Sequence, residues 1–390
     1  MNYRNNLPNL GFGCMRLPDS YEESEKLVLK AIEKGVNYFD TAYIYSGKEV
    51  LLGKILHSNN MRDKVRIATK IPLFMCKTYD DLDKIFEKQL IRLQTDYIDY
   101  YLLHMLNNPA ELSGLLAMGL DKWVNKKKED EKIKHIGFSF HGKGGDFIKL
   151  IDGYNWDFCM IQYNYLDIKN QAGLNGLQYA HSKNIPVIIM EPLRGGLLAD
   201  TKRIPKKAAD IFKSETMSPA QYALRWLWNH PEVSCVLSGM KTMWQLEDNI
   251  VVAKDSNPNC MSEDELKVIE RVTDAFNELK TIPCTGCDYC MPCPAGVNIP
   301  GCFSAYNAYC MDKKSFNQYL LNTGATHSKR GTAKGCVGCG QCEPRCPQSI
   351  PIQASLKKVG KKMEPLWFRI GMPIVRKYMA RKSPENDKTL

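Results

Sequence analysis

The sequence predicts an α/β protein in which about 275 residues form a closed barrel and the rest forms a small, mainly helical module. Two observations predict the barrel. Eight short, mostly apolar and β-branched runs recur before residue 280, and segments with helical spacing separate them. Strands that are apolar on both faces are typical of a parallel sheet covered by helices. A third observation, two dense cysteine runs after residue 280, predicts the module.

The eight runs are expected to be the strands of a (β/α)8, or TIM, barrel. Good helix formers at helical spacing mark the intervening segments 22–34, 80–94 and 219–230. A doubly wound sheet is the alternative, but no Gly-x-Gly-x-x-Gly turn follows an early strand, so that sheet would lack its usual phosphate site. The predicted strands are Leu10–Met15, Val36–Thr41, Val65–Lys70, Tyr97–Leu103, Lys134–Ser139, Phe158–Tyr163, Pro186–Met190 and Val233–Leu237.

Polar residues stand at or just after the ends of several predicted strands. In a TIM barrel the chemistry takes place at the C-terminal ends of the strands. Different titratable side chains at separate strand ends therefore form a candidate site. These residues are Asp40, Lys70, His104, Ser139, Gln162 and Glu191.

The two cysteine runs have the spacing of iron-sulfur ligands. The first places four cysteines two residues apart before Pro294, and the second has a last gap of three residues before Pro347, which is the bacterial ferredoxin pattern. Three closely spaced thiolates can hold one [4Fe-4S] cubane while the fourth cysteine reaches the neighbouring cluster. Paired zinc sites, which usually need only two Cys-x2-Cys pairs per metal, and a disulfide framework, which needs an oxidising compartment, are the alternatives. We expect one cluster on Cys284, Cys287, Cys290 and Cys346, and the other on Cys336, Cys339, Cys342 and Cys293.

Four stretches of the barrel together resemble the aldo/keto reductases: residues 35–45 (GVNYFDTAYIY), 67–70 (IATK), 97–104 (YIDYYLLH) and 136–139 (IGFS). Their order, spacing and strand context agree with that family. The added cysteine module makes the chain similar to the ferredoxin-containing branch of the superfamily. The resemblance implies a reductase of aldehydes or ketones that uses NAD(P)H, with a catalytic tetrad of Tyr45, Lys70, Asp40 and His104.

The chemistry of carbonyl reduction agrees with this tetrad. Hydride transfer places negative charge on the carbonyl oxygen, so a group must donate a proton to it. A tyrosine with its usual pKa near 10 is a weak acid at neutral pH, and Lys70 beside the Tyr45 phenol is expected to favour the phenolate. Asp40 is expected to pair with Lys70 from the neighbouring strand. His104 is expected to hold the carbonyl toward Tyr45.

The resemblance also implies a nicotinamide site across the barrel mouth. Ser139 and Gln162 correspond to residues that hold the carboxamide, and Asn164 lies nearby in the sequence. Arg194, Gly195 and Gly196 resemble the loop that contacts the pyrophosphate. The adenosine phosphate segment corresponds to Ser238, Lys241, Thr242, Gln245 and Asn249, and three of these, Lys241, Thr242 and Gln245, favour NADP(H) over NAD(H).

The chain departs from the family at two positions of this nicotinamide site. Ser139-Phe140-His141 replaces the usual Ser-Asn, and Met190 or Glu191 stands where an aromatic residue commonly stacks on the nicotinamide. No flavin motif is evident, although a barrel can bind a flavin without one.

The net charge of +10 lies mostly at the C-terminus, where residues 357–390 hold ten Lys and Arg against three Asp and Glu. We therefore expect a barrel over 1–275, a ferredoxin-like domain over 276–355, with helical spacing over 303–321, and a basic extension over 356–390. The extension either docks on an acidic partner or an anionic membrane face, or packs its apolar residues on the body. Nucleic acid is not expected as a partner.

No transmembrane run and no signal peptide is present in the sequence, so a cytoplasmic location is expected.

Two functions are consistent with these observations. The first is an NAD(P)H-dependent oxidoreductase that reduces a small-molecule carbonyl, coupled to or supported by the two clusters, with a ferredoxin or another redox protein as partner. The second is an electron-transfer subunit that docks a redox partner and keeps its barrel as a nicotinamide-sensing scaffold. The complete tetrad favours the first function, whereas Phe140 and Met190 favour the second.

Overall fold

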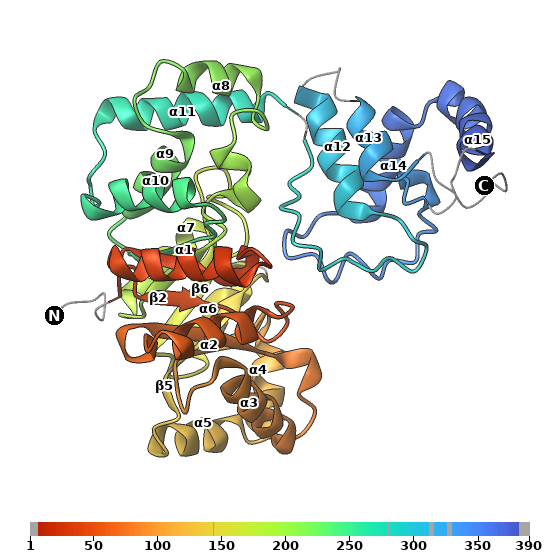
Figure 1. Cartoon of the computed structure of the whole chain (residues 1–390). Helices are drawn as coiled ribbons and strands as arrows, with labels where there is room; N and C mark the ends of the chain where they lie inside the picture. The colour runs from red at the N-terminus through yellow and green to blue at the C-terminus, as the bar shows by residue number, and fades with distance from the viewer. Residues whose placement is uncertain (1–6, 143, 280, 312–315, 326–329, 382–390) are drawn as a thin grey trace. The chain divides into compact units, whose positions relative to one another are not determined.

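The computed structural model describes the chain except for residues 1–6, 143, 280, 312–315, 326–329 and 382–390. The chain divides into two compact units (Figure 1). The first comprises Met1–Ala199 and Glu215–Glu270, and the second comprises Asp200–Ser214 and Arg271–Leu390. Among the described residues, no helix has both the length and the apolar character needed to cross a membrane.

The first unit is a closed barrel of eight parallel strands in sequence order, which confirms the predicted fold class and excludes the doubly wound sheet. Strand ends differ from the prediction by a few residues: the first strand stops at Gly13 because residues 14–16 turn into a 3-10 helix, and the third continues to Pro72. The strands are β1 Leu10–Gly13, β2 Tyr38–Asp40, β3 Arg66–Pro72, β4 Ile98–His104, β5 Ile133–Phe140, β6 Phe158–Gln162, β7 Val187–Met190 and β8 Val233–Ser238.

Helices separate the strands, and the predicted segments 22–34, 80–94 and 219–230 are confirmed as α1, α3 and α9. Local signals start two of them. Thr78 and Ser218 are the N-cap residues of α3 and α9, and the side chain of each accepts a hydrogen bond from the backbone N–H three residues further on. The acidic or amide side chain at that third position in turn accepts a hydrogen bond from the backbone N–H of the cap residue. The helices are α1 Tyr21–Glu33, α2 Lys48–Ser58, α3 Tyr79–Leu93, α4 Pro109–Ala117, α5 Leu120–Glu129, α6 Gly144–Asp152, α7 Gly173–Ser182, α9 Pro219–Trp228, α10 Met243–Lys254 and α11 Glu263–Asn277, with 3-10 turns η1 Cys14–Arg16, η2 Arg62–Lys64, η3 Leu73–Met75 and η4 Arg194–Ala199.

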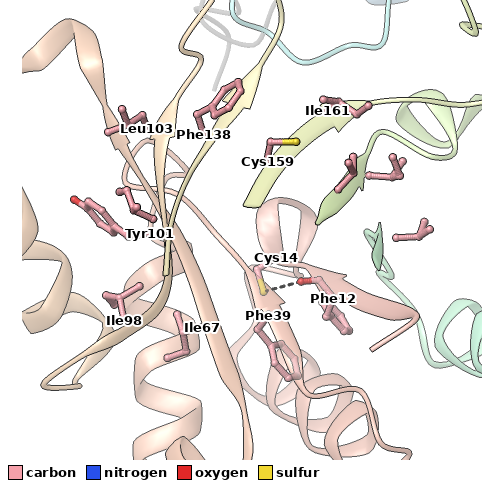
Figure 2. Packing of buried hydrophobic residues seen from close by; sticks show 14 of the residues in the cluster. Phe12, Cys14, Phe39, Ile67, Ile98, Tyr101, Leu103, Phe138, Cys159 and Ile161 are labelled. Carbon is pink, nitrogen blue, oxygen red and sulfur yellow. Dashed lines mark hydrogen bonds between the residues drawn. The ribbon is translucent and has the colours of Figure 1, made fainter. Parts of the chain in front are cut away.

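The alternation of side chains along the strands creates two cores. One set packs inside the barrel and includes Tyr38, Ala68 and Leu102. Residues of opposite parity pack between the strands and the helices, where Figure 2 shows Phe12, Phe39, Ile67, Ile98, Tyr101, Leu103, Phe138, Cys159 and Ile161. Because the period is two, Asp40, Lys70 and His104 continue the inner set at the C-terminal ends of their strands.

The second unit is mainly helical, as predicted. Its helices are α8 Lys206–Phe212, α12 Ile299–Met311, α13 Phe316–Asn322, α14 Ile352–Met363 and α15 Leu366–Arg381, with the 3-10 turn η6 Ala333–Gly335. The predicted helical stretch 303–321 is two helices, α12 and α13, rather than one. Part of the basic extension belongs to the core of this unit, since Leu356, Val359, Met363, Phe368 and Met372 are buried in it.

Candidate functional site

A buried ion pair joins two neighbouring strands at the barrel mouth. Asp40 ends β2, where it pairs with Ala68 of β3, and Lys70 lies two residues further along β3. The Lys70 Nζ donates to both carboxylate oxygens of Asp40, at 2.6 and 2.7 Å, and to the carbonyl of Thr41 at 2.8 Å. Burial raises the pKa of Asp40, and the Lys70 ammonium opposes that rise. The three acceptors fix the position of the ammonium and satisfy its three N–H donors.

Tyr45 and His104 lie beside this pair. The Lys70 Nζ is 5.2 Å from the centroid of the Tyr45 ring, and the Tyr45 and His104 rings meet edge to face at 6.1 Å. Tyr45 lies in the loop after β2, where its backbone accepts from Lys48 N–H and donates to the carbonyl of Ala42. All four predicted tetrad residues are therefore brought to one place.

The other two tyrosines of the motif lie elsewhere. Tyr38 is fully buried in the inner core of the barrel. The Arg92 guanidinium covers the ring of Tyr43 at 4.2 Å from its centroid. Tyr45 is thus the tyrosine of this stretch that meets Lys70 and His104.

A polar network on the outer side of β3 supports the mouth. Its centre is Glu49, which is 1% exposed and accepts from Thr69 Oγ1 and Gln89 Nε2, each at 2.7 Å, and from Arg92 at 3.0 Å. Gln89 also donates to the Lys70 carbonyl, and Arg92 to the Tyr43 carbonyl. This network fixes the position of the backbone segments that carry the tetrad. The sequence analysis did not predict it, because no local motif joins its members.

Two histidines near Lys70 are held in the neutral form. Burial, followed by the charges of Lys70 and His141, lowers the pKa of His104 well below its ordinary value. Burial also lowers the pKa of His141 to about 4, against a hydrogen bond with Gln171. His141 follows the inward-facing Ser139 by two residues, while Phe140 packs outward on Phe147 at 5.1 Å. The departure from Ser-Asn therefore brings a second imidazole close to His104.

The expected carboxamide contacts are buried and hydrogen-bonded within the protein. Ser139 Oγ accepts from the backbone N–H of Met105 at 2.9 Å. Gln162 Nε2 and Asn164 Nδ2 both donate to Asp167 Oδ2, at 2.9 and 3.1 Å. The Ser139 hydroxyl can still donate to a ligand while it accepts, and the Gln162 amide keeps a second N–H donor. The Asn164 amide is more fully used, since it also donates to the Glu191 carbonyl at 3.4 Å and its oxygen accepts from the backbone of Leu166 and Asp167.

The Asp167 carboxylate connects these amides to the predicted pyrophosphate loop. Arg194 Nε lies 3.2 Å from Asp167 Oδ2, and both side chains are largely buried. Gly195 and Gly196 follow in left-handed conformations, with φ of 69° and 85°, which glycine adopts without steric cost. Asp167 is a second residue that sequence reasoning missed, because it stands in a loop after β6 with no motif around it.

The predicted adenosine phosphate segment separates into two parts. Ser238 and Asn249 are buried and bonded to each other, with Asn249 Nδ2 donating to Ser238 Oγ at 2.7 Å. Lys241, Thr242 and Gln245 lie at the exposed N-terminus of α10, where Thr242 caps the helix and Gln245 Oε1 accepts from Lys241 N–H. Backbone N–H groups at such a terminus favour anions.

The eight cysteines of the two predicted ligand sets line two cavities of the second unit. One is lined by Cys284, Cys287, Cys290 and Cys346, and the other by Cys290, Cys293, Cys336, Cys339 and Cys342. Electrostatic interactions link Cys284 with Cys287 and Cys346, and Cys342 with Cys336 and Cys293. Four cysteines line the first cavity and five line the second, with Cys290 common to both, so each cavity has the four sulfur donors that a [4Fe-4S] cluster needs. No group of three or more His, Cys, Asp or Glu within the described residues is arranged to hold a single metal ion.

Comparisons with known proteins agree with both units. The aldo/keto reductase family matches residues 9–270, and a 4Fe-4S dicluster domain matches residues 283–350. L-galactose dehydrogenase of Arabidopsis thaliana is 26% identical over 69% of this chain and 92% of its own length. The 9,11-endoperoxide prostaglandin H2 reductase of Trypanosoma cruzi is 28% identical over 71% of this chain and 90% of its own length.

Solved structures share the barrel fold. The holo form of an aldo-keto reductase from Bacillus halodurans has a TM-score of 0.57 and 22% identity, and covers 68% of this chain and 91% of its own. An aldo-keto reductase from Klebsiella pneumoniae in complex with NADPH has a TM-score of 0.55 and 20% identity, with coverage of 68% and 91%. Because a family model matches well over half of the sequence, this chain belongs to the aldo/keto reductase family, and a 4Fe-4S dicluster domain follows its barrel.

Proposed function

We propose that the barrel mouth reduces an aldehyde or ketone with NAD(P)H and that Tyr45 is the general acid. The observation that carries this proposal is the ammonium of Lys70, which three acceptors hold in place beside Tyr45 and His104. A buried ion pair alone is common in proteins, but a tyrosine and a neutral histidine next to it form a constellation suited to proton transfer.

Each residue has a definite part in the reaction. A nicotinamide held at this mouth would supply the hydride to the carbonyl carbon. Tyr45 donates its phenol proton to the carbonyl oxygen as negative charge develops there, and the fixed charge of Lys70 stabilises the phenolate that remains. Neutral His104 donates a hydrogen bond to the same oxygen and orients the carbonyl. Asp40 keeps Lys70 charged and in position.

We further propose NADP(H) rather than NAD(H) as the cofactor. Lys241 is exposed at the N-terminus of α10, where a cation and backbone N–H groups suit a 2′-phosphate. Ser139 is the carboxamide contact best supported, since its hydroxyl can donate while its oxygen accepts from Met105. Gln162, Asn164, Arg194, Gly195 and Gly196 remain proposed contacts, and a flavin has no support in the residues described.

The eight cysteines are proposed to hold two clusters in the sets given above, one with Cys346 and the other with Cys293. Burial raises the pKa of the Cys284 thiol to about 11 and that of Cys290 to about 12, so cluster assembly must remove these protons. Clusters of this type exchange single electrons, whereas carbonyl reduction uses two. The clusters either pass electrons to a redox protein or support the fold of their domain. A cytoplasmic location, a small-molecule substrate and a peripheral membrane contact of the basic extension stay predictions.

Two observations favour the second function, an electron-transfer subunit with the barrel as scaffold. Gln162 and Asn164 are both bonded to Asp167, and Met190 stands where an aromatic residue usually stacks. We expect such a mouth to hold a nicotinamide less firmly than the mouths of the family usually do.

The replacement Tyr45→Phe separates the two functions. The assay follows NADPH consumption with a panel of aldehydes and ketones, using anaerobic, cluster-replete protein. Loss of the general acid is expected to lower kcat by about 10²- to 10⁴-fold, while Tyr43→Phe, the matched control, retains activity within a few-fold. Equal activity in the wild type and in Tyr45→Phe would contradict the proposed function.

A further inference from the structure

The second unit has an open groove, of about 1130 Å³, that no part of the proposed reaction uses. Four separate segments line it: the loop around Gly296, residues 322–324 at the end of α13, the stretch that runs from Arg330 to Gly335, and Glu364 with the first turns of α15 around Arg369. Its volume exceeds the range of about 300–1,000 Å³ that is usual for small-molecule sites. The groove is therefore large and open enough for a segment of another protein.

The groove is positively charged. Arg330, Lys334 and Arg369 line it, and all three are exposed, with the Lys334 ammonium donating to the Glu364 carbonyl at 2.9 Å. Among the described residues that line the groove, Glu364 is the only acid. It is buried, and its carboxylate accepts from Tyr319 Oη at 2.7 Å and from the backbone N–H of Lys334 at 2.9 Å. The acid therefore serves the interior of the unit, and the cations determine the charge that a ligand meets.

The charge of the groove is part of a larger asymmetry. Residues 281–390 contain 16 Lys and Arg but only six Asp and Glu, so they hold the whole net charge of +10. A field of one sign over such a region attracts an oppositely charged macromolecule and accelerates its association.

The floor of the groove is held by backbone hydrogen bonds. Gly331 N–H donates to the Thr323 carbonyl at 2.7 Å, and Asn298 N–H donates to the Gly331 carbonyl at 2.9 Å. A Cβ on Gly331 would lie 2.5 Å from the Asn298 nitrogen, so the two segments approach as closely as glycine allows. This floor is preformed, which lowers the cost of binding a partner.

The groove adjoins one of the two cysteine cavities. Ala295 lines both the groove and the cavity of Cys293, Cys336, Cys339 and Cys342, and Gly335 at the groove wall immediately precedes Cys336. The other cysteine cavity shares no lining residue with the groove. A partner seated in the groove would therefore lie next to one particular cluster site.

We propose that this groove docks an acidic one-electron carrier protein and that its occupant exchanges electrons with the cluster of Cys293, Cys336, Cys339 and Cys342. The proposal rests on the proposed presence of two clusters. In each transfer one electron leaves the reduced carrier, which becomes oxidised, and enters the oxidised cluster of this chain. No bond is formed or broken.

The test compares two double variants of the full, cluster-replete chain with equal change of charge. Arg330→Glu combined with Arg369→Glu reverses the charge of two side chains that line the groove. Lys357→Glu with Lys361→Glu is the control, because both lysines are exposed on α14 and neither lines the groove. The probe is an acidic bacterial [4Fe-4S] ferredoxin. Its dissociation constant is measured by calorimetry in low and high salt, and cluster reduction by the reduced probe is followed in a stopped-flow instrument.

The groove variant is expected to bind roughly tenfold more weakly in low salt and to be reduced more slowly by the probe, while the control changes about threefold or less. High salt is expected to weaken binding of the wild type. Equal weakening in both variants, absence of binding, or binding of anionic vesicles in place of the ferredoxin would overturn the proposal. Iron content and electron paramagnetic resonance are measured first: fewer than two clusters contradict the proposed function, whereas two clusters with unaltered binding contradict only the docking.

Discussion

The barrel mouth and the cysteine-rich unit hold their charged groups in opposite ways. At the mouth Lys70 is 1% exposed and paired, and Asp40 and Glu49 are buried and each forms an ion pair. In the second unit Arg330 and Arg369 are exposed on an open groove. Preorganised buried charges stabilise a transition state over short distances and resist salt, whereas exposed charges attract partners and are screened. We therefore expect chemistry at the barrel mouth and docking at the groove.

The largest expected effect concerns the cysteine sets. Cys339→Ser removes one ligand from the cluster site that adjoins the groove, and iron content is expected to fall from about eight to about four atoms per chain. Cys310→Ser is the control, since Cys310 lies in the same unit but lines neither cavity. Iron analysis and electron paramagnetic resonance measure the outcome. Full iron content in Cys339→Ser would show that Cys339 is no ligand.

Next in size is the loss of the buried cation. Lys70→Met leaves the Asp40 carboxylate buried without its partner, which is expected to lower the free energy of unfolding by about 3–5 kcal/mol. Adding Asp40→Asn is expected to recover part of this loss. The control is Lys134→Met, because Lys134 is half exposed where it pairs with Asp99, and such a pair contributes about 1 kcal/mol or less. Urea unfolding followed by tryptophan fluorescence measures both, and equal losses in the two variants would contradict the account of the mouth.

A third prediction concerns pH. The folded-state pKa of His141 is about 4, below the usual 6.5, so between these values the unfolded chain binds more protons than the folded chain. Stability contributed by His141 is thus complete above pH 6.5 and is lost as pH falls toward 4, at a cost of about 2 kcal/mol at pH 5. His141→Asn is expected to reduce the loss of stability between pH 7 and pH 5 by this amount, and exposed His57→Asn is not. Parallel pH profiles for His141→Asn and the wild type would refute the prediction.

The smallest effect concerns the support of the proposed cofactor site. Asp167→Asn removes the negative charge that Gln162, Asn164 and Arg194 all contact. The KM for NADPH is therefore expected to rise about fivefold, which corresponds to about 1 kcal/mol of binding free energy, while kcat stays within about twofold. Steady-state kinetics on a reactive aldehyde measure this, with exposed Asp130→Asn as control. A lower KM in Asp167→Asn would mean that Asp167 competes with the nicotinamide for the two amides, as the scaffold function suggests.

Much of the fold could be predicted from the sequence, because strand and helix patterns are local. Each barrel strand is a short apolar run, and the polar residue at its end marks the mouth, so the positions of Asp40, Lys70 and His104 at the mouth follow from the strand pattern. Cysteine spacing is equally local, and the two ligand sets could be proposed from it.

The remainder of the site depends on contacts between distant segments. Glu49 on α2 meets Gln89 and Arg92 on α3, and Asp167 meets Arg194 from the next loop. The role of His141 also needed the strand parity, which turns Phe140 outward. The groove was beyond sequence reasoning for the same reason, since Gly296, Arg330 and Arg369 come together only in the folded unit.

The most direct test of the central claim follows one atom. Cluster-replete protein is incubated anaerobically with NADPH that carries deuterium at C4 of the nicotinamide and with a panel of aldehydes and ketones, and the products are analysed by mass spectrometry. The account predicts deuterium on the former carbonyl carbon in the wild type and at least about a hundredfold less in Tyr45→Phe. Reduction of the clusters by NADPH, with no deuterium in any product, would contradict it and favour an electron-transfer subunit.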